Sequence, residues 1–220
     1  MKSAKEAREH LKKVDLILGR VIETIALPTR KRHTDRFYAL VRAIIRQQLS
    51  GKAADSIERK FIEICGKGKF PTASAILKIP DNAMRRAGLS YGKVSYIKNL
   101  AHAVHTEELD LNVLHKLSNE AAIESLIKIK GIGRWTAEMF LMFTLKRPDI
   151  FSYGDLGLRN AMVKLYKLRK TPSRQRAEEI SKKWSPHRTL ACLYLWASLT
   201  KETDKKLILG QTWDNHESVE

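Results

Sequence analysis

Two segments of the sequence carry residues whose types and spacing could do chemistry together. Gly131 and Gly133 lie in the stretch Ile-Lys-Gly-Ile-Gly-Arg-Trp-Thr-Ala, between two apolar patterns with helical spacing. Glycine at these positions permits a positive φ and leaves backbone N–H groups uncovered, and the N-terminus of the following helix attracts an anion. Asp155 follows in a loop that contains Gly and Pro. We therefore predict a phosphate-binding helix-hairpin-helix turn. The carboxylate of Asp155, which follows it in the sequence, could do chemistry on the molecule whose phosphate the turn binds.

The charge of the chain agrees with a phosphate-binding role. The sequence has 41 Lys plus Arg against 24 Asp plus Glu, which gives a formal net charge of +17 and a pI near 9.9. Such a field attracts polyanions, and a domain this basic is a candidate nucleic-acid binder. Charge alone does not separate DNA from RNA, and a cationic surface that serves only solubility remains an alternative at this point.

Several classes of protein are disfavoured by what the sequence contains. Cys65 and Cys192 are the two cysteines, whereas an iron–sulfur cluster needs about four thiolates and a zinc site a similar set of Cys or His. We expect no cofactor and no metal held by side chains. No run approaches the roughly 18 to 20 apolar residues of a membrane span, and the N-terminus has no signal-peptide core. We expect an intracellular monomer that does not bind membranes.

Apolar residues recur with helical spacing along nearly the whole chain, and no alternating strand pattern of useful length occurs. We therefore predict an all-α fold. One long helix is expected over residues 4–25, and shorter helices are expected elsewhere. Four further positions are predicted to begin helices, with Thr72 and Asp81 as N-caps and with Thr171-Pro172 and Ser185-Pro186 as cap-plus-proline pairs.

The order of several motifs resembles the helix-hairpin-helix (HhH-GPD) superfamily of DNA glycosylases, and the branch that it resembles is 3-methyladenine DNA glycosylase II. The matching segments cover residues from about 35 to 200. They are Gln47-Gln48-Leu49-Ser50, Gly88-Leu89-Ser90, Gly131-Ile132-Gly133-Arg134-Trp135-Thr136-Ala137, Gly154-Asp155, Trp184-Ser185-Pro186-His187-Arg188 and Tyr194-Leu195-Trp196.

The resemblance implies two helical subdomains with an active-site cleft between them. Residues 1–34 and 136–220 are expected to form one subdomain, and residues 35–135 the other, with the hairpin at its end. The implied partner is double-stranded DNA containing alkylated bases, and the implied location is a DNA-containing compartment, either cytoplasm and nucleoid or nucleus. The resemblance also allows a monovalent cation at the hairpin carbonyls.

Asp155 stands where the family places its catalytic acid. Cleavage of a base from deoxyribose builds positive charge at C1′, as glycoside hydrolysis does, and an aligned carboxylate stabilises that charge. Asp155 could also orient or deprotonate the attacking water. Its alternative role is that of a helix N-cap, which is common for an Asp immediately before a helix. The other acids nearby are Asp149 and Glu138.

Trp135 occupies the position at which relatives that also nick the strand carry a nucleophilic lysine, and a Schiff base needs an amine there. We therefore predict hydrolysis without a lyase step. The indole suits a cationic alkylated purine, such as 3-methyladenine or 7-methylguanine, because an aromatic face attracts a cation; packing in the core is the alternative. Met139 and His187 stand where the enterobacterial-type enzyme has aromatic residues.

Further residues complete the expected site. A base inside a duplex must be flipped out, and a side chain must fill the gap that it leaves. Gln48 resembles the wedge residue of the family, and Leu49 or Ser50 could share this role. The alternative is that Gln47 and Gln48 cap helix ends. The predicted pocket comprises Trp135, Met139, Tyr153, Trp184 and His187. The predicted DNA contacts comprise Gln48, Leu49, Ser50, Lys130, Gly131, Gly133, Arg134 and Thr136.

Two other functions remain open on the sequence alone. A glycosylase for another lesion would share the hairpin and the aspartate. A non-catalytic helix-hairpin-helix module would need the hairpin and the charge but not Asp155, so substitution of Asp155 separates the two classes.

Overall fold

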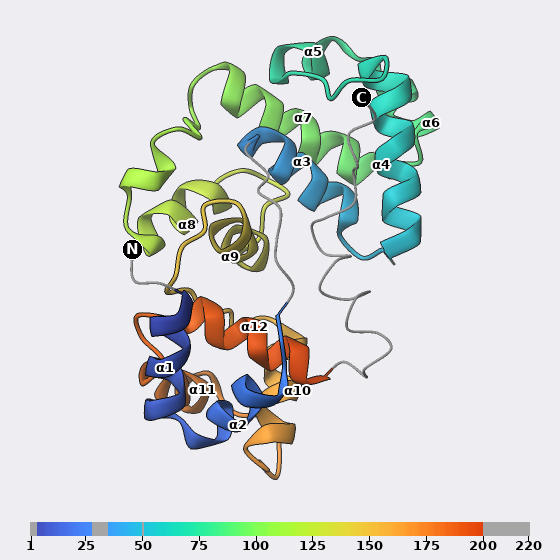
Figure 1. The fold of residues 1–220 in the computed structure, drawn as a ribbon. Helices are drawn as coiled ribbons and strands as arrows, with labels where there is room; N and C mark the ends of the chain where they lie inside the picture. Colours follow the sequence, from blue (N-terminus) through green and yellow to red (C-terminus); the bar gives the residue numbers. More distant parts are fainter. Residues whose placement is uncertain (1–3, 28–34, 50, 200–220) are drawn as a thin grey trace. The chain divides into compact units, whose positions relative to one another are not determined.

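The computed structural model describes residues 4–27, 35–49 and 51–199, and every regular element in these residues is a helix, which confirms the all-α prediction (Figure 1). The helices, in chain order, are α1 Ala4–Val14, α2 Leu16–Thr24, α3 Arg36–Arg46, α4 Gly51–Gly66, α5 Ala73–Lys78, α6 Asp81–Arg86, α7 Tyr91–His105, the 3-10 helix η1 Leu114–Lys116, α8 Asn119–Ile127, α9 Arg134–Phe143, α10 Leu156–Leu165, α11 Arg174–Lys182 and α12 Arg188–Leu199.

The chain forms two compact units. The terminal unit comprises residues 1–31 and 141–220, and the central unit comprises residues 32–140. The division falls inside α9, between Phe140 and Leu141. Asp155 therefore belongs to the terminal unit, whereas the hairpin and the Gln48 corner belong to the central unit.

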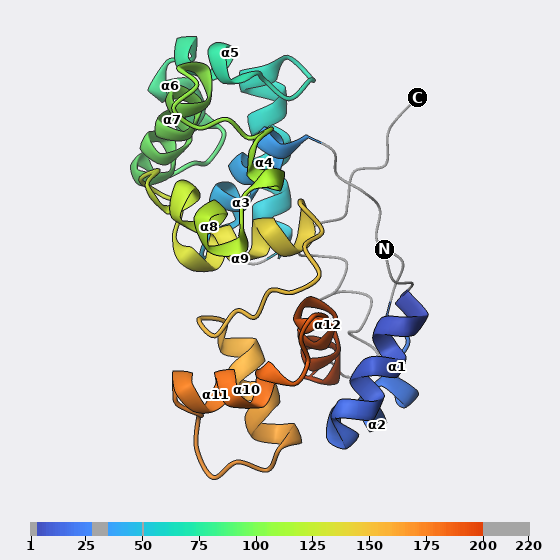
Figure 2. The ribbon, with the colours of Figure 1, turned by 90° about the vertical axis from the view of Figure 1, so that its left-hand side faces the viewer.

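In the terminal unit, the N-terminal helices pack on helices from the end of the chain. α2 and α1 both contact α12, and α12 contacts α10 (Figures 1 and 2). The core of this unit is formed by fully buried apolar side chains, which include Leu11, Leu18, Leu158 and Leu195. Burial of each such side chain contributes about 1.5 to 3 kcal/mol relative to an exposed one, so α1 and α2 are integral to the unit.

In the central unit, α7 is the main support, because it packs on α3, α5 and α6 (Figure 1). The core includes Leu40, Phe61 and Ile97, all fully buried. A buried ion pair links α3 to α4, with Arg42 Nε 3.0 Å from Glu58 Oε1. A buried carboxylate is tolerated only where such partners compensate its lost hydration.

The predicted single helix over residues 4–25 is wrong, because Asp15 divides it into α1 and α2. The Asp15 backbone is extended, and its carboxylate accepts hydrogen bonds from the backbone N–H groups of Ile17 and Leu18, each at 3.1 Å. A side chain that caps the next helix in this way ends the previous one. The apolar stripe continues across the break, so the periodicity does not reveal it.

The predicted helix starts have mixed outcomes. Thr72 is confirmed as an N-cap, with its hydroxyl accepting from the Ala75 N–H at 3.3 Å. Asp81 is instead the first residue of α6 and pairs with Lys98. Thr171-Pro172 does not begin α11, because Ser173 is the cap. Ser185-Pro186 does not begin α12 either, since the Ser185 hydroxyl donates to Asp149 and the helix starts at Arg188.

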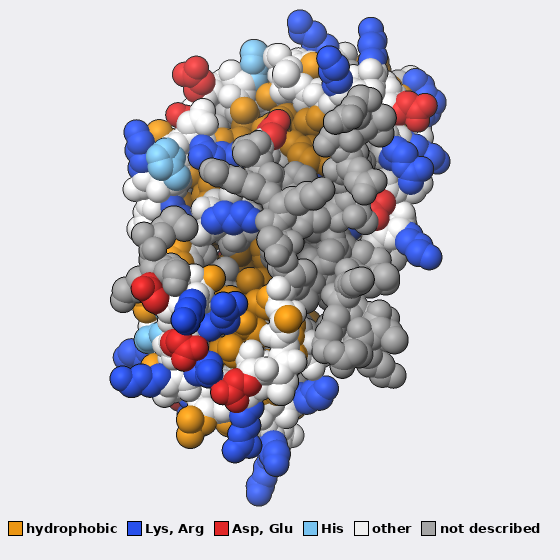
Figure 3. All heavy atoms as spheres, in the orientation of Figure 1, with side chains coloured by type: hydrophobic (Ala, Val, Ile, Leu, Met, Phe, Trp, Pro, Cys, Tyr) orange, Lys and Arg blue, Asp and Glu red, His pale blue; other side chains and the backbone are white. Residues whose placement is uncertain are grey.

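The surface is basic, in keeping with the composition. On the face drawn in Figure 3, Lys and Arg side chains lie over both units. Among the described residues, none of the helices has the length and apolar character needed to cross a membrane.

Candidate functional site

The hairpin is formed as predicted, between the C-terminus of α8 and the N-terminus of α9. Gly131 has a φ of +106°, and a Cβ there would lie 2.3 Å from Cγ of Tyr96, so this position needs glycine for its conformation and for its space. Gly133 does not adopt a positive φ. No heavy atom lies within 4 Å of the position that its Cβ would occupy, so its backbone is open to a ligand.

The charges around the hairpin are not equivalent. Lys128 and Lys130 are exposed. Arg134 donates two hydrogen bonds to Glu120, each of 2.7 Å, and a third to Glu138 at 3.1 Å. These interactions raise the pKa of Arg134 above its ordinary value. The guanidinium thus braces α8 against α9, while 41% of the side chain stays exposed. A contact of Arg134 with DNA stays a prediction.

Thr136 also has an internal role. Its side chain is buried, and its hydroxyl oxygen lies 3.5 Å from Nε2 of Gln47. A phosphate cannot reach this hydroxyl from solvent, which corrects the prediction for its side chain. The same Gln47 amide donates to the carbonyl oxygen of Gly131 at 3.0 Å. This hairpin carbonyl thus has a polar partner, and a monovalent cation there stays a prediction.

The corner between α3 and α4 is exposed. Gln48 has a φ of +57°, in the left-handed region that non-glycine residues rarely adopt. Leu49 has 37% of its surface exposed. Both side chains are thus presented to solvent, as a wedge requires; Ser50 lies outside the described residues. The capping alternative holds for Gln47, which is the C-cap of α3.

Trp135 lies in the first turn of α9 and is 43% exposed. A core position is excluded by this exposure, because buried aromatic side chains of the two units are almost fully covered. Met139, one helical turn later, is buried. The exposed aromatic face that a pocket would need is therefore supplied in this helix by Trp135.

Asp155 is the N-cap of α10, which is the alternative that the sequence left open. Its Oδ1 accepts the backbone N–H of Leu158 at 2.8 Å and the indole Nε1–H of Trp196 at 2.9 Å. The side chain is nevertheless partly exposed. Gly157 makes room for this arrangement, since a Cβ there would lie 3.1 Å from Oδ1 and 3.2 Å from Trp196 Cδ1. Two neutral donors therefore fix the orientation of the carboxylate.

Trp196 is a neighbour of Asp155 that the sequence patterns do not single out. It lies on α12 and, besides its bond to Asp155, packs its ring on Phe143 with a centroid distance of 5.9 Å. Its position in the segment Tyr194-Leu195-Trp196 was the available signal. Local periodicity describes this tryptophan only as apolar, so its polar contact could not be read from the sequence.

The two other acids near Asp155 in the sequence are held by arginines. Asp149 accepts from Arg188 Nε at 2.8 Å and from Arg188 Nη2 at 2.9 Å. Burial alone would raise the pKa of Asp149, but the hydrogen bonds from Arg188 and Ser185 hold this pKa below its ordinary value. Glu138 is buried against Arg134. Both carboxylates thus have structural partners.

The remaining pocket candidates differ in accessibility. Trp184 is fully buried and donates its Nε1–H to Asp15 at 2.8 Å. Its predicted place in a pocket wall is therefore wrong, since it is part of the core of the terminal unit. Tyr153 is partly exposed, and its hydroxyl donates to the Pro172 carbonyl at 3.1 Å. His187 is partly exposed and stacks edge-on against His10 at 5.2 Å.

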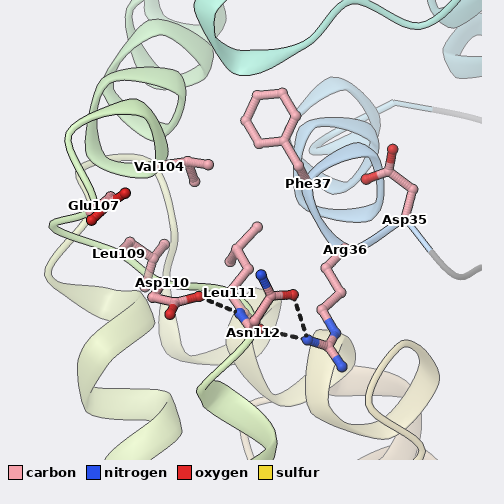
Figure 4. Close-up of a pocket in the computed structure, with 9 residues that line it drawn as sticks. All are labelled: Asp35, Arg36, Phe37, Val104, Glu107, Leu109, Asp110, Leu111 and Asn112. Carbon is pink, nitrogen blue, oxygen red and sulfur yellow. Dashed lines mark hydrogen bonds between the residues drawn. The ribbon is translucent and has the colours of Figure 1, made fainter.

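A separate surface hollow of about 710 Å³ lies in the central unit, between the start of α3 and the segment after α7 (Figure 4). Arg36 crosses it and donates to the Leu111 carbonyl at 3.0 Å and to Asn112 Oδ1 at 3.2 Å. None of the predicted site residues lines it. Over the described residues, no cluster of three or more His, Cys, Asp or Glu could hold a metal ion.

Comparison with known proteins identifies similar sequences and structures. Residues 41–187 match the model of the HhH-GPD superfamily of base excision DNA repair proteins. The chain is 36% identical over 198 residues to DNA-3-methyladenine glycosylase 1 of Schizosaccharomyces pombe, and the match covers 88% of this chain and 87% of that protein.

Two solved structures have the same fold. One is the Schizosaccharomyces pombe 3-methyladenine DNA glycosylase in complex with abasic DNA, with a TM-score of 0.80 and 34% identity over 90% of this chain and 98% of that one. The other is a DNA-3-methyladenine glycosidase from Bacillus halodurans, with a TM-score of 0.79 and 34% identity over 96% of each chain.

Proposed function

Because the chain belongs to the HhH-GPD superfamily of base excision DNA repair proteins, we propose that it is a DNA glycosylase for alkylated purines in duplex DNA. It hydrolyses the bond between the base and deoxyribose and leaves an abasic site. The observation that carries this proposal is the similarity to a 3-methyladenine DNA glycosylase over 90% of this chain and 98% of the other. The enzyme is expected to work in a DNA-containing compartment.

Asp155 is the proposed catalytic residue. Departure of the base builds positive charge at C1′ of the sugar, and a carboxylate held in place stabilises that charge without having to reorganise during the reaction. The backbone N–H of Leu158 and the indole of Trp196 supply this fixed orientation. The same carboxylate would orient or deprotonate the water that attacks C1′.

Trp135 is the proposed contact for the damaged base. Its 43% exposure leaves indole surface available for stacking, and 3-methyladenine and 7-methylguanine are cationic rings that an aromatic face attracts. A base that already carries positive charge leaves without strong general-acid help, which suits a site with one proposed carboxylate. We therefore propose that the enzyme is a 3-methyladenine DNA glycosylase of type II.

The absence of a lyase step is also proposed from Trp135. A lyase needs an amine that forms a Schiff base with the abasic sugar, and indole cannot supply one. Treatment of the enzyme with borohydride during turnover should therefore trap no covalent protein–DNA adduct. A trapped adduct would contradict this part of the proposal.

The DNA backbone is proposed to lie on the hairpin, at Lys130, Gly131 and Gly133, with Gln48 and Leu49 filling the gap left by the flipped base. Lys130 and the open Gly133 backbone are exposed, as phosphate contacts require. Binding through phosphates predicts an affinity that falls steeply as the salt concentration rises.

The test is incubation of the protein with methylated duplex DNA, followed by identification of the free bases. The wild type should release 3-methyladenine and 7-methylguanine. Release of neither base, together with retained binding to the DNA, would favour a non-catalytic helix-hairpin-helix module. Release of other damaged bases alone would favour a glycosylase for a different lesion.

A further inference from the structure

The corner between α3 and α4 has a backbone conformation that must be held in place. Gln48 has a φ of +57°, and for a residue with a side chain this costs of order 1 kcal/mol or more. Such a conformation persists only where the surrounding structure determines it. The groups that contact this corner therefore determine the positions of Gln48 and Leu49.

Lys93 of α7 holds the corner from one side. Its Nζ donates to the carbonyl oxygens of Ile45 and Gln47, each at 2.7 Å. These carbonyls lie at the C-terminus of α3, where the helix leaves such groups without internal partners and where a cation is favoured. Lys93 is partly buried where it makes these contacts, and this burial lowers its pKa.

Gln47 ties the same corner to the hairpin. Its Nε2 donates to the Gly131 carbonyl at 3.0 Å and lies 3.5 Å from the Thr136 hydroxyl. Gln47 is 84 residues from Gly131 in the sequence. Its side chain is thus a direct cross-link between the exposed corner and the turn that is proposed to bind phosphate.

α7 completes the connection, because Tyr96 contacts the hairpin from the same helix that carries Lys93. The Tyr96 ring lies against Gly131, where no Cβ could fit. Lys93 and Tyr96 are three residues apart, so they share one face of α7. One face of one helix therefore supports both the corner and the hairpin.

We propose that Gln47 and Lys93 are positioning residues that fix the distance between the phosphate-binding hairpin and the Gln48–Leu49 corner, so that the corner enters the base stack at the damaged nucleotide. This inference rests on the proposed glycosylase function. We call Gln47 and Lys93 together the clamp. The hairpin determines where the DNA strand is held, and the clamp determines where the base stack is opened. Misplacement by about 1 Å can cost about 100-fold in rate.

The test uses two duplexes that carry the same 7-methylguanine, either paired with cytosine or placed opposite an abasic site. Opening the stack costs a few kcal/mol for a paired base and less for one that has lost its partner. Gln47→Met removes the amide donor at similar size. Its single-turnover rate should fall about tenfold or more on the paired duplex, and clearly less on the duplex with the abasic site.

Lys93→Met should show the same dependence on pairing, because it removes the other half of the clamp without touching the hairpin. Gln175→Met, at an exposed position of α11, and Lys98→Met, farther along α7, are the matched controls. Both should leave the two rates unchanged. Thermal unfolding of each variant reports whether it is folded. If Gln47→Met lowers the melting temperature, the rates of Lys93→Met alone test the positioning role.

The outcomes separate this inference from the proposed function. If the wild type releases no base from either duplex, the proposed function fails. If the wild type is active and both clamp variants match it, or lose the same factor on both duplexes, the positioning role is overturned. A loss concentrated on the paired duplex supports it.

Discussion

Two aspartates of the terminal unit share the same local arrangement. Asp15 is the N-cap of α2, and Asp155 is the N-cap of α10. Each also accepts a hydrogen bond from a tryptophan indole, at 2.8 Å from Trp184 to Asp15 and at 2.9 Å from Trp196 to Asp155. Neither the capping motif nor the indole partner therefore distinguishes a structural carboxylate from a chemical one.

The difference lies in their surroundings. Asp15 is 2% exposed and also accepts from the Tyr166 hydroxyl at 2.6 Å and pairs with Lys183 at 3.1 Å. Burial alone would raise the pKa of Asp15, but these hydrogen bonds lower it below the ordinary value. Asp155 is partly exposed. The same cap is thus enclosed at Asp15 and accessible at Asp155, and only the accessible carboxylate could act on a bound substrate.

The largest expected effect is that of Asp155→Asn on base release. Loss of a carboxylate that stabilises transition-state charge should lower the single-turnover rate about 100-fold or more. Asparagine caps a helix about as well as aspartate, so the melting temperature should stay close to that of the wild type. A large fall in melting temperature would show that Asp155, like Asp15, is mainly structural.

Asp15→Ala should have the opposite pattern. The substitution removes a cap and leaves the partly buried Tyr166 hydroxyl and the buried Trp184 indole without their acceptor, so the free energy of unfolding should fall by about 3 to 5 kcal/mol. Denaturant unfolding measures this loss. Base release per folded molecule, measured well below the melting temperature, should be unchanged. Loss of base release would contradict a purely structural role of Asp15.

The two tryptophans provide a matched pair with smaller effects. Trp196→Phe keeps a ring against Phe143 but removes the hydrogen bond to Asp155, and we expect base release to fall about tenfold, near the lower end for a group that supports charge stabilisation. Trp184→Phe should instead cost about 1 to 3 kcal/mol of stability, with base release retained. Equal effects of the two substitutions on the rate would contradict the distinction.

The smallest effect concerns pH. Hydrogen bonds hold the pKa of Asp15 below its ordinary value in the folded protein. The contribution of Asp15 to stability is therefore present above the pKa of the unfolded chain and is lost as pH falls through the folded value. The stability difference between wild type and Asp15→Asn should therefore be constant near neutral pH and shrink below about pH 4. Unfolding titrations between pH 7 and pH 3 measure it. A difference that grew as pH fell would contradict a lowered pKa.

The sequence predicts the parts of the site that depend on local chemistry. The glycine at position 131, the cap at Asp155 and the exposed Gln48 corner follow from residue types next to helix ends, and the structure has them there. The fold class follows from helical periodicity for the same reason, since each helix is defined by neighbours in the sequence.

Contacts between distant residues could not be predicted in this way. Trp184 and Trp196 both lie in apolar helical patterns, yet one reaches an aspartate 169 residues away and the other an aspartate 41 residues away. The pair between Arg134 and Glu120 of α8 is a further contact that the hairpin motif does not reveal. Tertiary packing alone decides which polar groups are used internally.

The catalytic role proposed for Asp155 is tested by measuring release of free 3-methyladenine and 7-methylguanine from methylated duplex DNA. Wild type, Asp155→Asn and Asp15→Asn are measured side by side at equal concentrations of folded protein. We expect Asp155→Asn to release little base while it still binds the DNA, and Asp15→Asn to release base at the wild-type rate. Release by Asp155→Asn at the wild-type rate would contradict the assignment of Asp155 as the catalytic residue.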